Sequence, residues 1–363
     1  TRGFHPRKRG SIPLGTAKLF MNKKIVITGG AGFMGTNTAI YFYKKNWKIY
    51  IIDDCSREGT KNNLSNLKKK IKYNFYKFNV SNYKKISKII SKIKPSILLH
   101  CAGQVAVTKS IQNPKKDFDS NVVGTFNVLE SLRLYSKKTK LIFISTNKVY
   151  GNINKNLSVS KKRYFSKDAK KTIDENYPLD FYSPYGCSKG SAEQYVRDYS
   201  RIYKLDTIVL RLSCVYGIMQ FGIEDHGWIT WLSIASYFNK KIKIFGNGKQ
   251  VRDVLFIDDL VNLFYKIFNK KKLKHNIYNV GGGIKNSLSI LELIAELEKV
   301  LSKKIEYKKF NWRQGDQKIY ISNIERIRKD TGWYPKTKFS VGLSKLIKWI
   351  KFNDSIIKKT LRI

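Results

Sequence analysis

Two short stretches of the sequence carry side chains that could move protons. Residues 145–151 read STNKVYG and follow the apolar run KLIFI, so a hydroxyl, an amide and an amine come directly after a buried strand. Residues 183–190 read SPYGCSKG and place Tyr185 and Lys189 four positions apart at the start of a helix, hence on one face. A free tyrosine, with a pKa of about 10, is a poor base at neutral pH, but a neighbouring ammonium favours the phenolate. The pair could therefore exchange a proton with a substrate hydroxyl, unless the tyrosine is simply packed and the lysine solvated.

A glycine-rich turn lies upstream of both stretches. TGGAGFMG, residues 28–35, follows the first strand, and Gly29, Gly32 and Gly35 would allow a tight turn, close approach to a pyrophosphate and close helix packing. By itself the turn also fits a plain strand-to-helix connection. Asp53 ends the second strand, where a carboxylate can accept hydrogen bonds from the adenosine ribose and would repel a 2′-phosphate. The two features predict NAD rather than NADP, although the nearby Arg57 argues for NADP.

These residues lie at the ends of strands in an alternating pattern. Short β-branched runs, expected to be buried parallel strands, alternate with amphipathic stretches, expected to be helices. The strands are predicted within residues 23–30, 48–54, 96–103, 140–146 and 206–213, and the helices within 33–46, 117–134 and 190–204. The order predicts an α/β fold, a Rossmann-type doubly wound parallel sheet with a smaller, mixed C-terminal substrate lobe.

The domain boundaries follow from a break in this rhythm near Tyr216, after which glycine and aromatic residues become frequent. Residues 254–268 look like a return to the first domain, and residues 287–303 and 341–352 read as amphipathic helices. We expect the NAD-binding Rossmann domain over residues 21–217 and 251–280, and the substrate lobe over 218–250 and 281–351. Residues 1–20 are basic, precede Met21 and are expected to be a leader or tag.

Composition limits the possible classes of function. The 363 residues are 42% hydrophobic and contain no apolar run near the roughly 18 residues of a membrane helix, so we expect a soluble protein with no membrane partner. The four cysteines show no CxxC spacing in a chain too large to need disulfides, which fits the reducing cytoplasm. The four histidines are scattered, so no metal site and no histidine-based triad is expected.

The formal net charge of +45 could indicate a nucleic-acid or anionic-membrane partner. Lysine, however, is spread over nearly every predicted helix face, as in KKISKIISKIK and KIFNKKKLK, and forms no single patch with interleaved aromatic residues. We interpret the charge as a compositional habit and expect no nucleic-acid partner. A basic surface would still attract a diphosphate.

The glycine turn, Asp53, Thr146 and the Tyr185/Lys189 pair together resemble the extended short-chain dehydrogenase/reductase family of NAD-dependent nucleotide-sugar epimerases and dehydratases, over about residues 21–351. The resemblance implies tightly held NAD, a nucleotide sugar between the lobes, transient oxidation of the sugar, and a homodimer or higher homo-oligomer. It implies that Thr146 hydrogen-bonds the reacting hydroxyl, that Tyr185 takes its proton, and that Lys189 also holds the nicotinamide ribose. The cofactor-binding residues that it implies are Gly29, Gly32, Phe33, Met34, Gly35, Asp53, Ser56, Arg57, Asn79, Val80, Ala102, Gly103, Gln104, Asn121, Tyr185 and Lys189. Asn79 departs from the family pattern, because relatives often carry aspartate there.

Asn147 and Lys148 distinguish between the branches of this family. The 4,6-dehydratase branch carries an Asp-Glu pair at these positions, and eliminating water suits two carboxylates that act as acid and base. An amide does neither and a charged lysine cannot be the base, so dehydration is disfavoured and epimerisation remains. The stretches STNKVYG, CAGQVAVTKSIQNP, DFYSPYGCSKG and GNGKQVRDVL together resemble a narrower branch, whose reaction inverts carbon 2 of a CDP-linked 3,6-dideoxyhexose through a 2-keto intermediate.

The expected substrate contacts come from both lobes. Arginine forks suit a diphosphate, and Arg252 and Arg313 are the candidates, unless each is a surface arginine paired to Asp253 or Asp316. The full set of candidates is Gln104, Ser110, Asn147, Gln220, Arg252 and Arg313, with Lys109 and His226 as further contacts and Trp228 as a contact or core residue.

Three rival functions stay open. A 4-epimerase of a UDP-linked or other nucleotide-linked hexose would use the same acid and base, with substrate orientation deciding the carbon. A nucleic-acid-binding protein could keep the dehydrogenase fold as a scaffold, and salt-sensitive retention of RNA or DNA would favour it. A net dehydrogenase or reductase would consume NAD(H) stoichiometrically, which an epimerase does not.

Overall fold

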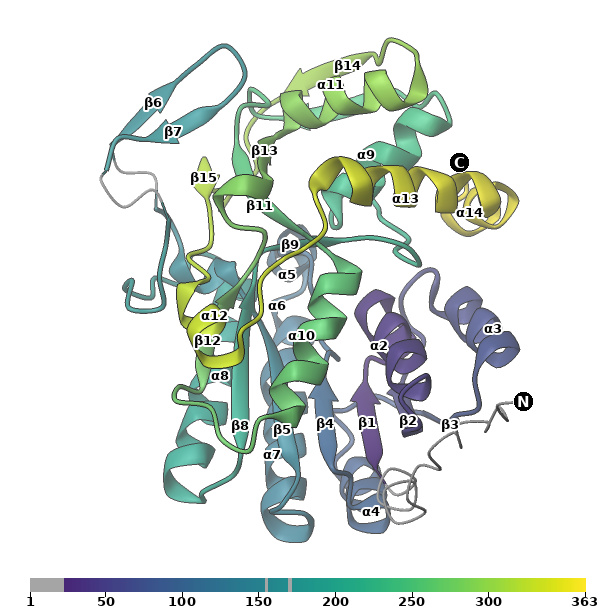
Figure 1. Cartoon of the computed structure of the whole chain (residues 1–363), viewed down its shortest axis with the longest axis vertical. Helices are drawn as coiled ribbons and strands as arrows, with labels where there is room; N and C mark the ends of the chain where they lie inside the picture. Colours follow the sequence, from purple (N-terminus) through teal and green to yellow (C-terminus); the bar gives the residue numbers. More distant parts are fainter. Residues whose placement is uncertain (1–22, 154–155, 169–171) are drawn as a thin grey trace, which may run out of the picture.

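The computed structural model describes residues 23–153, 156–168 and 172–363. At its centre is a seven-stranded sheet in the order β12-β8-β5-β4-β1-β2-β3, in which every neighbouring pair is parallel (Figure 1). Its strands are β1 (Lys24–Thr28), β2 (Lys48–Asp53), β3 (Asn74–Lys77), β4 (Ile97–His100), β5 (Lys140–Thr146), β8 (Thr207–Leu212) and β12 (Ile277–Val280). Since strand order runs outward in both directions from β1, the predicted doubly wound sheet is confirmed.

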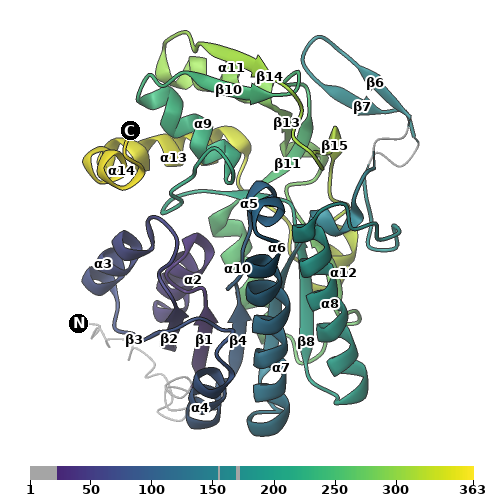
Figure 2. The ribbon, with the colours of Figure 1, turned by 180° about the vertical axis from the view of Figure 1, so that it is seen from behind.

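Helices cover both faces of this sheet because both faces are apolar. Successive side chains of a strand point to opposite faces, and Ile25 and Ile27 pack into one buried cluster while Val26 packs into another. The first cluster lies under α2 and α10, with α3 beside α2 (Figure 1), and the second lies under α4, α7 and α8 (Figure 2). These helices are α2 (Phe33–Tyr43), α3 (Thr60–Lys70), α4 (Tyr83–Ile93), α7 (Gly124–Tyr135), α8 (Pro184–Ile202) and α10 (Ile257–Asn269).

A smaller lobe lies above the carboxyl ends of the strands (Figure 1). Its strands are β9 (Cys214–Tyr216), β11 (Val251–Phe256), β13 (Ser287–Ser289) and β15 (Ile319–Tyr320) in one sheet, and β10 (Ile242–Phe245) and β14 (Tyr307–Phe310) in another. Its helices are α9 (Trp228–Tyr237), α11 (Ile290–Leu301), α13 (Phe339–Phe352) and α14 (Asp354–Leu361). A hairpin of β6 (Leu157–Val159) and β7 (Tyr164–Ser166) reaches this lobe, where Tyr164 N donates to Lys249 O at 3.0 Å. The lobe is thus mixed, with parallel and antiparallel pairs.

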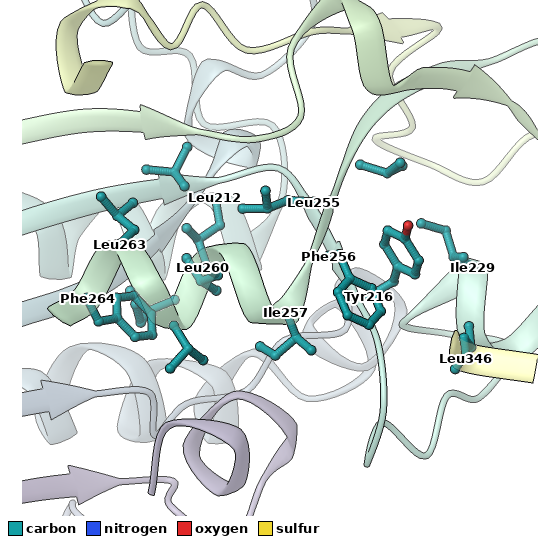
Figure 3. Packing of buried hydrophobic residues seen from close by; sticks show 14 of the residues in the cluster. Leu212, Tyr216, Ile229, Leu255, Phe256, Ile257, Leu260, Leu263, Phe264 and Leu346 are labelled. Carbon is teal, nitrogen blue, oxygen red and sulfur yellow. The ribbon is translucent and has the colours of Figure 1, made fainter. Parts of the chain in front are cut away.

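One apolar cluster joins the smaller lobe to the large sheet. Figure 3 shows Leu260 and Phe264 of α10 in the same cluster as Tyr216, Ile229 and Leu346 of the smaller lobe. Burying apolar side chains stabilises a protein by roughly 25 cal/mol for each Å² of apolar surface removed from water. The two parts are therefore held together by a shared core rather than by surface contacts.

The sheet membership of residues 251–256 differs from the predicted division. These residues, assigned above to the Rossmann domain, form β11, which pairs with β9, β13 and β15 of the smaller lobe. The chain returns to the large sheet one step later, because α10 begins at Ile257 directly after this strand. The domain boundaries as a whole stay a prediction, and the suggested leader, residues 1–20, lies outside the described residues.

The expected helix over residues 117–134 is not continuous. It is divided into α6 (Pro114–Phe118), the π-helical turn η1 (Asp119–Val123) and α7. The wide turn carries Asn121, whose side chain is 1% exposed and points into the protein. The remaining short elements are α5 (Val107–Gln112), η2 (Asn147–Tyr150), η3 (Ile284–Asn286) and α12 (Glu325–Thr331). In the part of the chain that the structure describes, no helix has the length and apolar character needed to cross a membrane.

Candidate active site

A pocket of about 840 Å³ lies between the carboxyl edge of the large sheet and the smaller lobe. Its walls include the glycine turn, the ends of β2, β4 and β5, the start of α8, and the segments around residues 219–232, 243–252 and 313–316. All the predicted site residues line it except Ser110 and Asn121, and Lys109, His226 and Trp228 also lie in its wall. Most residues chosen from the sequence therefore line one pocket, although the sequence did not predict which of them contact one another.

The glycine turn forms one end of the pocket. Gly29 has a φ of +66°, and a Cβ atom there would lie 2.8 Å from the backbone nitrogen of Ala102, so only glycine fits without strain. A Cβ at Gly35 would lie 2.5 Å from the Cα of Gly30, which means that the helix packs directly on the turn. Gly32 is different, since a Cβ there would meet only the carbonyl oxygen of Gly29, at 3.1 Å. Its missing side chain leaves space in the pocket beside the start of α2, where a pyrophosphate would fit.

Asp53 holds this turn in addition to facing the pocket. Its carboxylate accepts hydrogen bonds from Ala31 N at 3.0 Å and from Cys55 N at 2.8 Å. Burial raises the pKa of Asp53, and the two backbone hydrogen bonds oppose that rise. Arg57 lies exposed on the following loop and contacts the ring of His226 from the smaller lobe. The residue that argued for NADP is thus engaged with the opposite wall of the pocket.

Asn79 also lies at this end, where its amide donates to the carboxylate of Asp54 at 2.7 Å. Its side-chain oxygen accepts from Ser81 N at 2.9 Å, which fixes the orientation of the amide. The departure from the family pattern therefore leaves an ordered polar group in the pocket wall.

The structure brings Thr146, Tyr185 and Lys189 together. Helix α8 begins immediately before the tyrosine because Ser183 caps it, accepting from Gly186 N at 3.0 Å, and proline follows at the first helical position. Tyr185 and Lys189 are 9% and 6% exposed, and the hydroxyl of Thr146, at the end of β5, influences the pKa of the Tyr185 phenol. The Lys189 ammonium lies 4.2 Å from the ring centroid of Phe143.

Burial controls the ionisation of this pair. It raises the pKa of Tyr185 to about 12, against the opposing influence of the Thr146 hydroxyl, and it lowers the pKa of Lys189 to about 8. In the protein alone the tyrosine is therefore a phenol. It needs additional positive charge nearby before it can act as a base at neutral pH.

A buried network lies behind the pair and was not found from the sequence. Thr125 donates its hydroxyl proton to Asn121 O at 2.6 Å, so it can only accept from His100 Nε2, at 3.1 Å. His100 Nδ1 then accepts from the hydroxyl of Thr28 at 2.6 Å. Burial, together with the charge of Lys189, lowers the pKa of His100 to about 3, so the ring is neutral. The signal in the sequence was a polar residue at the end of a buried strand, which we counted only among scattered histidines.

Asn121 completes this network instead of lining the pocket. Its amide nitrogen donates to the hydroxyl of Ser188 at 2.9 Å and lies 3.3 Å from Gln104 O. It therefore connects the loop after β4 to the helix that carries Tyr185 and Lys189. Ser110 has a similar position, since it is fully buried and its hydroxyl accepts from Tyr185 N at 3.1 Å.

The other end of the pocket is built from charged side chains. Arg252, which is 7% exposed, donates to the carboxylate of Asp316 at 2.7 Å, and the ammonium of Lys148 lies 3.8 Å from the same oxygen. Arg313 stacks on the ring of Phe245, with 4.0 Å between the guanidinium carbon and the ring centroid. Its guanidinium also lies 3.7 Å and 3.6 Å from the carboxylates of Glu224 and Asp225. The cations expected to bind a diphosphate thus have carboxylate partners in the protein alone.

Neutral amides occupy the space between the two ends. Asn147 Nδ2 donates to Gln317 Oε1 at 3.2 Å, and Gln317 in turn donates to Gly151 O at 2.7 Å. Gln220 is 8% exposed and accepts from the hydroxyl of Thr230, while Gln104 donates to Ala106 O at 2.7 Å. Among the described residues, no group of three or more His, Cys, Asp or Glu side chains gathers as a metal site would.

Comparison with known proteins identifies relatives along almost the whole chain. The sequence profile of a family described as GDP-mannose 4,6 dehydratase matches residues 26–346. A CDP-paratose 2-epimerase of Salmonella typhi is 39% identical over 333 residues, which cover 90% of this chain and 98% of the relative.

Solved structures agree in fold. A UDP-glucose 4-epimerase of Thermotoga maritima, solved with UDP-glucose, has a TM-score of 0.77 at 26% identity and covers 92% of this chain and 99% of its own. A dTDP-glucose 4,6-dehydratase of Bacillus anthracis, solved with NAD, has a TM-score of 0.75 at 28% identity, with coverage of 92% and 98%.

Proposed function

The chain belongs to the GDP-mannose 4,6-dehydratase family of extended short-chain dehydrogenases/reductases, an enzyme family of nucleotide-sugar epimerases and dehydratases, and on that premise we propose that it is an NAD-dependent CDP-sugar 2-epimerase. The proposed reaction interconverts CDP-paratose and CDP-tyvelose. The observation that carries it is the 39% identity to a CDP-paratose 2-epimerase across 98% of that relative. The membership confirms the resemblance found in the sequence.

NAD is the cofactor, and the pocket offers it a suitable place. The open space at Gly32, the start of α2 and the carboxylate of Asp53 fit the pyrophosphate and adenosine ribose of a dinucleotide. Tyr185 and Lys189 would lie at its nicotinamide end. When bound, NAD accepts a hydride from the sugar carbon and later returns it.

The residues of the chain then handle the proton. Thr146 and Tyr185 hold the reacting hydroxyl, because both side chains line the pocket and the Thr146 hydroxyl influences the pKa of the Tyr185 phenol. The ammonium of Lys189 and the positive charge of the oxidised cofactor stabilise the phenolate, so that Tyr185 can accept the hydroxyl proton although its pKa in the protein alone is about 12. Loss of the proton and the hydride would leave a 2-ketone. Return of the hydride to the opposite face of the turned sugar would invert carbon 2, while Tyr185 would give its proton back to the oxygen, so no net redox change results.

Dehydration is disfavoured by the two residues after Thr146. The Asn147 amide cannot donate or accept a proton as an acid or base, and it is tied to Gln317. Lys148, paired with Asp316, is a cation rather than a base while it is charged. These observations support epimerisation over elimination.

Proton NMR of CDP-paratose, incubated with the purified protein and without added cofactor, tests the proposal. We expect an equilibrium mixture with CDP-tyvelose, seen in the coupling pattern at carbon 2. An unchanged spectrum, from protein shown by absorbance to contain NAD, would contradict it.

A second candidate is a 4-epimerase of a nucleotide-linked hexose, which the likeness to a UDP-glucose 4-epimerase favours. The same acid and base serve carbon 4 if the sugar binds in another orientation. Incubation with UDP-glucose and a search for UDP-galactose in the same NMR assay separates the two candidates.

We also propose a homodimer, in accord with the resemblance. The outer faces of α7 and α8 carry exposed aromatic and aliphatic side chains, namely Phe126, Leu134, Tyr195 and Ile202. Apolar side chains on two adjacent helices suit an interface with a second copy. Light scattering should give twice the mass of 42.2 kDa. The expected cytoplasmic location and the expected absence of a nucleic-acid partner stay predictions.

A further inference from the structure

Lys148 is a cation that has no role in the proposed mechanism, although it lies beside the reacting groups. It lies two residues after Thr146, and its backbone N–H donates to the hydroxyl of Thr146 at 3.2 Å. The same hydroxyl influences the pKa of the Tyr185 phenol. Because the lysine side chain is only 20% exposed and lines the pocket, its ammonium lies within the sugar region and not in bulk solvent.

The ammonium is held at a fixed place by the opposite wall. It donates to Gly315 O at 3.2 Å and lies 3.8 Å from the carboxylate of Asp316. Arg252 binds the same carboxylate at 2.7 Å, so Asp316 is anchored by a buried arginine before it meets the lysine. An ammonium has three N–H donors. Gly315 O accepts from one of them, and Asp316 at 3.8 Å is an ion-pair contact rather than a hydrogen bond, so donors remain for a ligand in the pocket.

We propose that Lys148 is a specificity-determining residue that donates a hydrogen bond to an oxygen of the sugar. The inference rests on the proposed function, which supplies the nucleotide sugar. Position favours the sugar over the diphosphate, because the backbone of Lys148 is hydrogen-bonded to Thr146 at the reacting groups. Of the two cations expected for the diphosphate, Arg313 lies against Phe245, Glu224 and Asp225, and Arg252 is bound to Asp316.

The burial of Lys148 supports this role. Together with the nearby charge of Arg252, it lowers the pKa of Lys148 to about 8, while Asp316 and Cys214 favour the charged form. The side chain is thus charged at neutral pH, at a site where solvent screens it little. A donor of this kind distinguishes a sugar that presents an acceptor oxygen from one that does not.

The experiment compares CDP-paratose with CDP, which has the diphosphate but no sugar. In the Lys148→Met holoenzyme we expect KM for CDP-paratose to rise about 10-fold to 100-fold, as for loss of one charged hydrogen bond, with kcat within about threefold. The dissociation constant of CDP, measured by calorimetry, should stay within about threefold. Lys148→Gln, which is polar but uncharged, should show the same split and serves if the methionine variant does not fold.

Lys140→Met is the matched control. Lys140 is another buried lysine, at the first residue of β5, the strand that ends two residues before Lys148, and it pairs with Asp206 at 3.3 Å. Its replacement should lower the melting temperature and leave KM for CDP-paratose unchanged.

Three outcomes would overturn the inference. An unchanged KM in both Lys148 variants means that no sugar contact exists, and an equal loss of CDP affinity assigns the lysine to the diphosphate. If the wild-type holoenzyme leaves CDP-paratose unchanged, the proposed function fails and the inference fails with it. This assay of the wild type is carried out before any variant is made.

Discussion

The two ends of the pocket are built in different ways. The cofactor end is made mainly of backbone groups and short side chains, with the turn at Gly29, the strand ends and the His100 network held by buried hydrogen bonds. The sugar end is made of long charged side chains, Lys148, Arg252 and Arg313, which reach the pocket from three distant segments.

The cofactor end is preorganised by the backbone, whereas at the sugar end each buried charge is compensated by an opposite charge. Backbone groups at the cofactor end need no partner from the other lobe, because the same hydrogen bonds that form the sheet and turn also shape the site. A buried cation is costly without a counter-charge, and at the sugar end Asp316, Glu224 and Asp225 supply it. We therefore expect changes at the cofactor end to remove function outright, and changes at the sugar end to adjust affinity.

The largest effect is expected where the two ends meet. Tyr185→Phe removes the phenolic oxygen but keeps the ring and the start of α8, so kcat should fall about 10²-fold to 10⁴-fold. NAD content, measured from the absorbance of the purified and denatured protein, should match that of the wild type. Full activity in this variant would contradict the catalytic role proposed for Tyr185 and, with it, the proposed division between the two ends.

Two glycines test the cofactor end. A methyl group at Gly35 would collide with backbone, so Gly35→Ala should lower the free energy of unfolding by about 1–3 kcal/mol. A methyl group at Gly32 would enter the pocket, so Gly32→Ala should change stability by less than about 1 kcal/mol yet reduce NAD affinity at least about 10-fold. Urea unfolding and NAD titration measure the two effects. Equal losses of stability would mean that Gly32 serves packing and not the ligand.

One lysine from each end of the pocket has a lowered pKa, so the free energy of unfolding should depend on pH with a predictable sign. The pKa is about 8 for both Lys148 and Lys189, against an ordinary value of 10.5, so between these values the folded protein has released protons that the unfolded chain still binds. Stability should therefore rise with pH in this window, by at most about 1.4 kcal/mol per pH unit for each lysine.

Lys189→Met isolates the contribution of one lysine. The free energy of unfolding of the wild type, minus that of the variant, should increase between pH 8 and pH 10 in urea titrations. A difference that stays constant or falls would contradict the lowered pKa.

The smallest effect is expected at the rim of the sugar end. Glu224 lies 3.7 Å from Arg313 and 3.6 Å from Lys243, where it competes with a diphosphate for both cations. Glu224→Gln should raise the affinity for CDP about twofold to fivefold at low salt, and the gain should shrink as salt rises. A loss of affinity in calorimetry would show that the carboxylate positions Arg313 instead of competing with the ligand.

Local sequence was sufficient for most of the fold. The strands within residues 23–30, 48–54, 96–103, 140–146 and 206–213 were predicted because each is a short β-branched run, apolar on both faces. Two strands of the large sheet, β3 and β12, were not predicted, since NFYK and IYNV are short and each follows a lysine-rich stretch. The division of the helix around Asn121 was missed because a π-turn leaves no mark on the 3.6-residue periodicity.

The sequence by itself determined the glycine turn, Asp53 and the Tyr185/Lys189 pair, because their function depends on spacing along one strand, turn or helix. Tertiary structure decided the rest. It placed Ser110 and Asn121 behind the pocket wall and paired Arg252 with Asp316 across 64 positions. It also turned Lys148 toward the wall that carries Gly315. No local pattern encodes these contacts, since burial of a charge selects whichever partner the two lobes bring within reach.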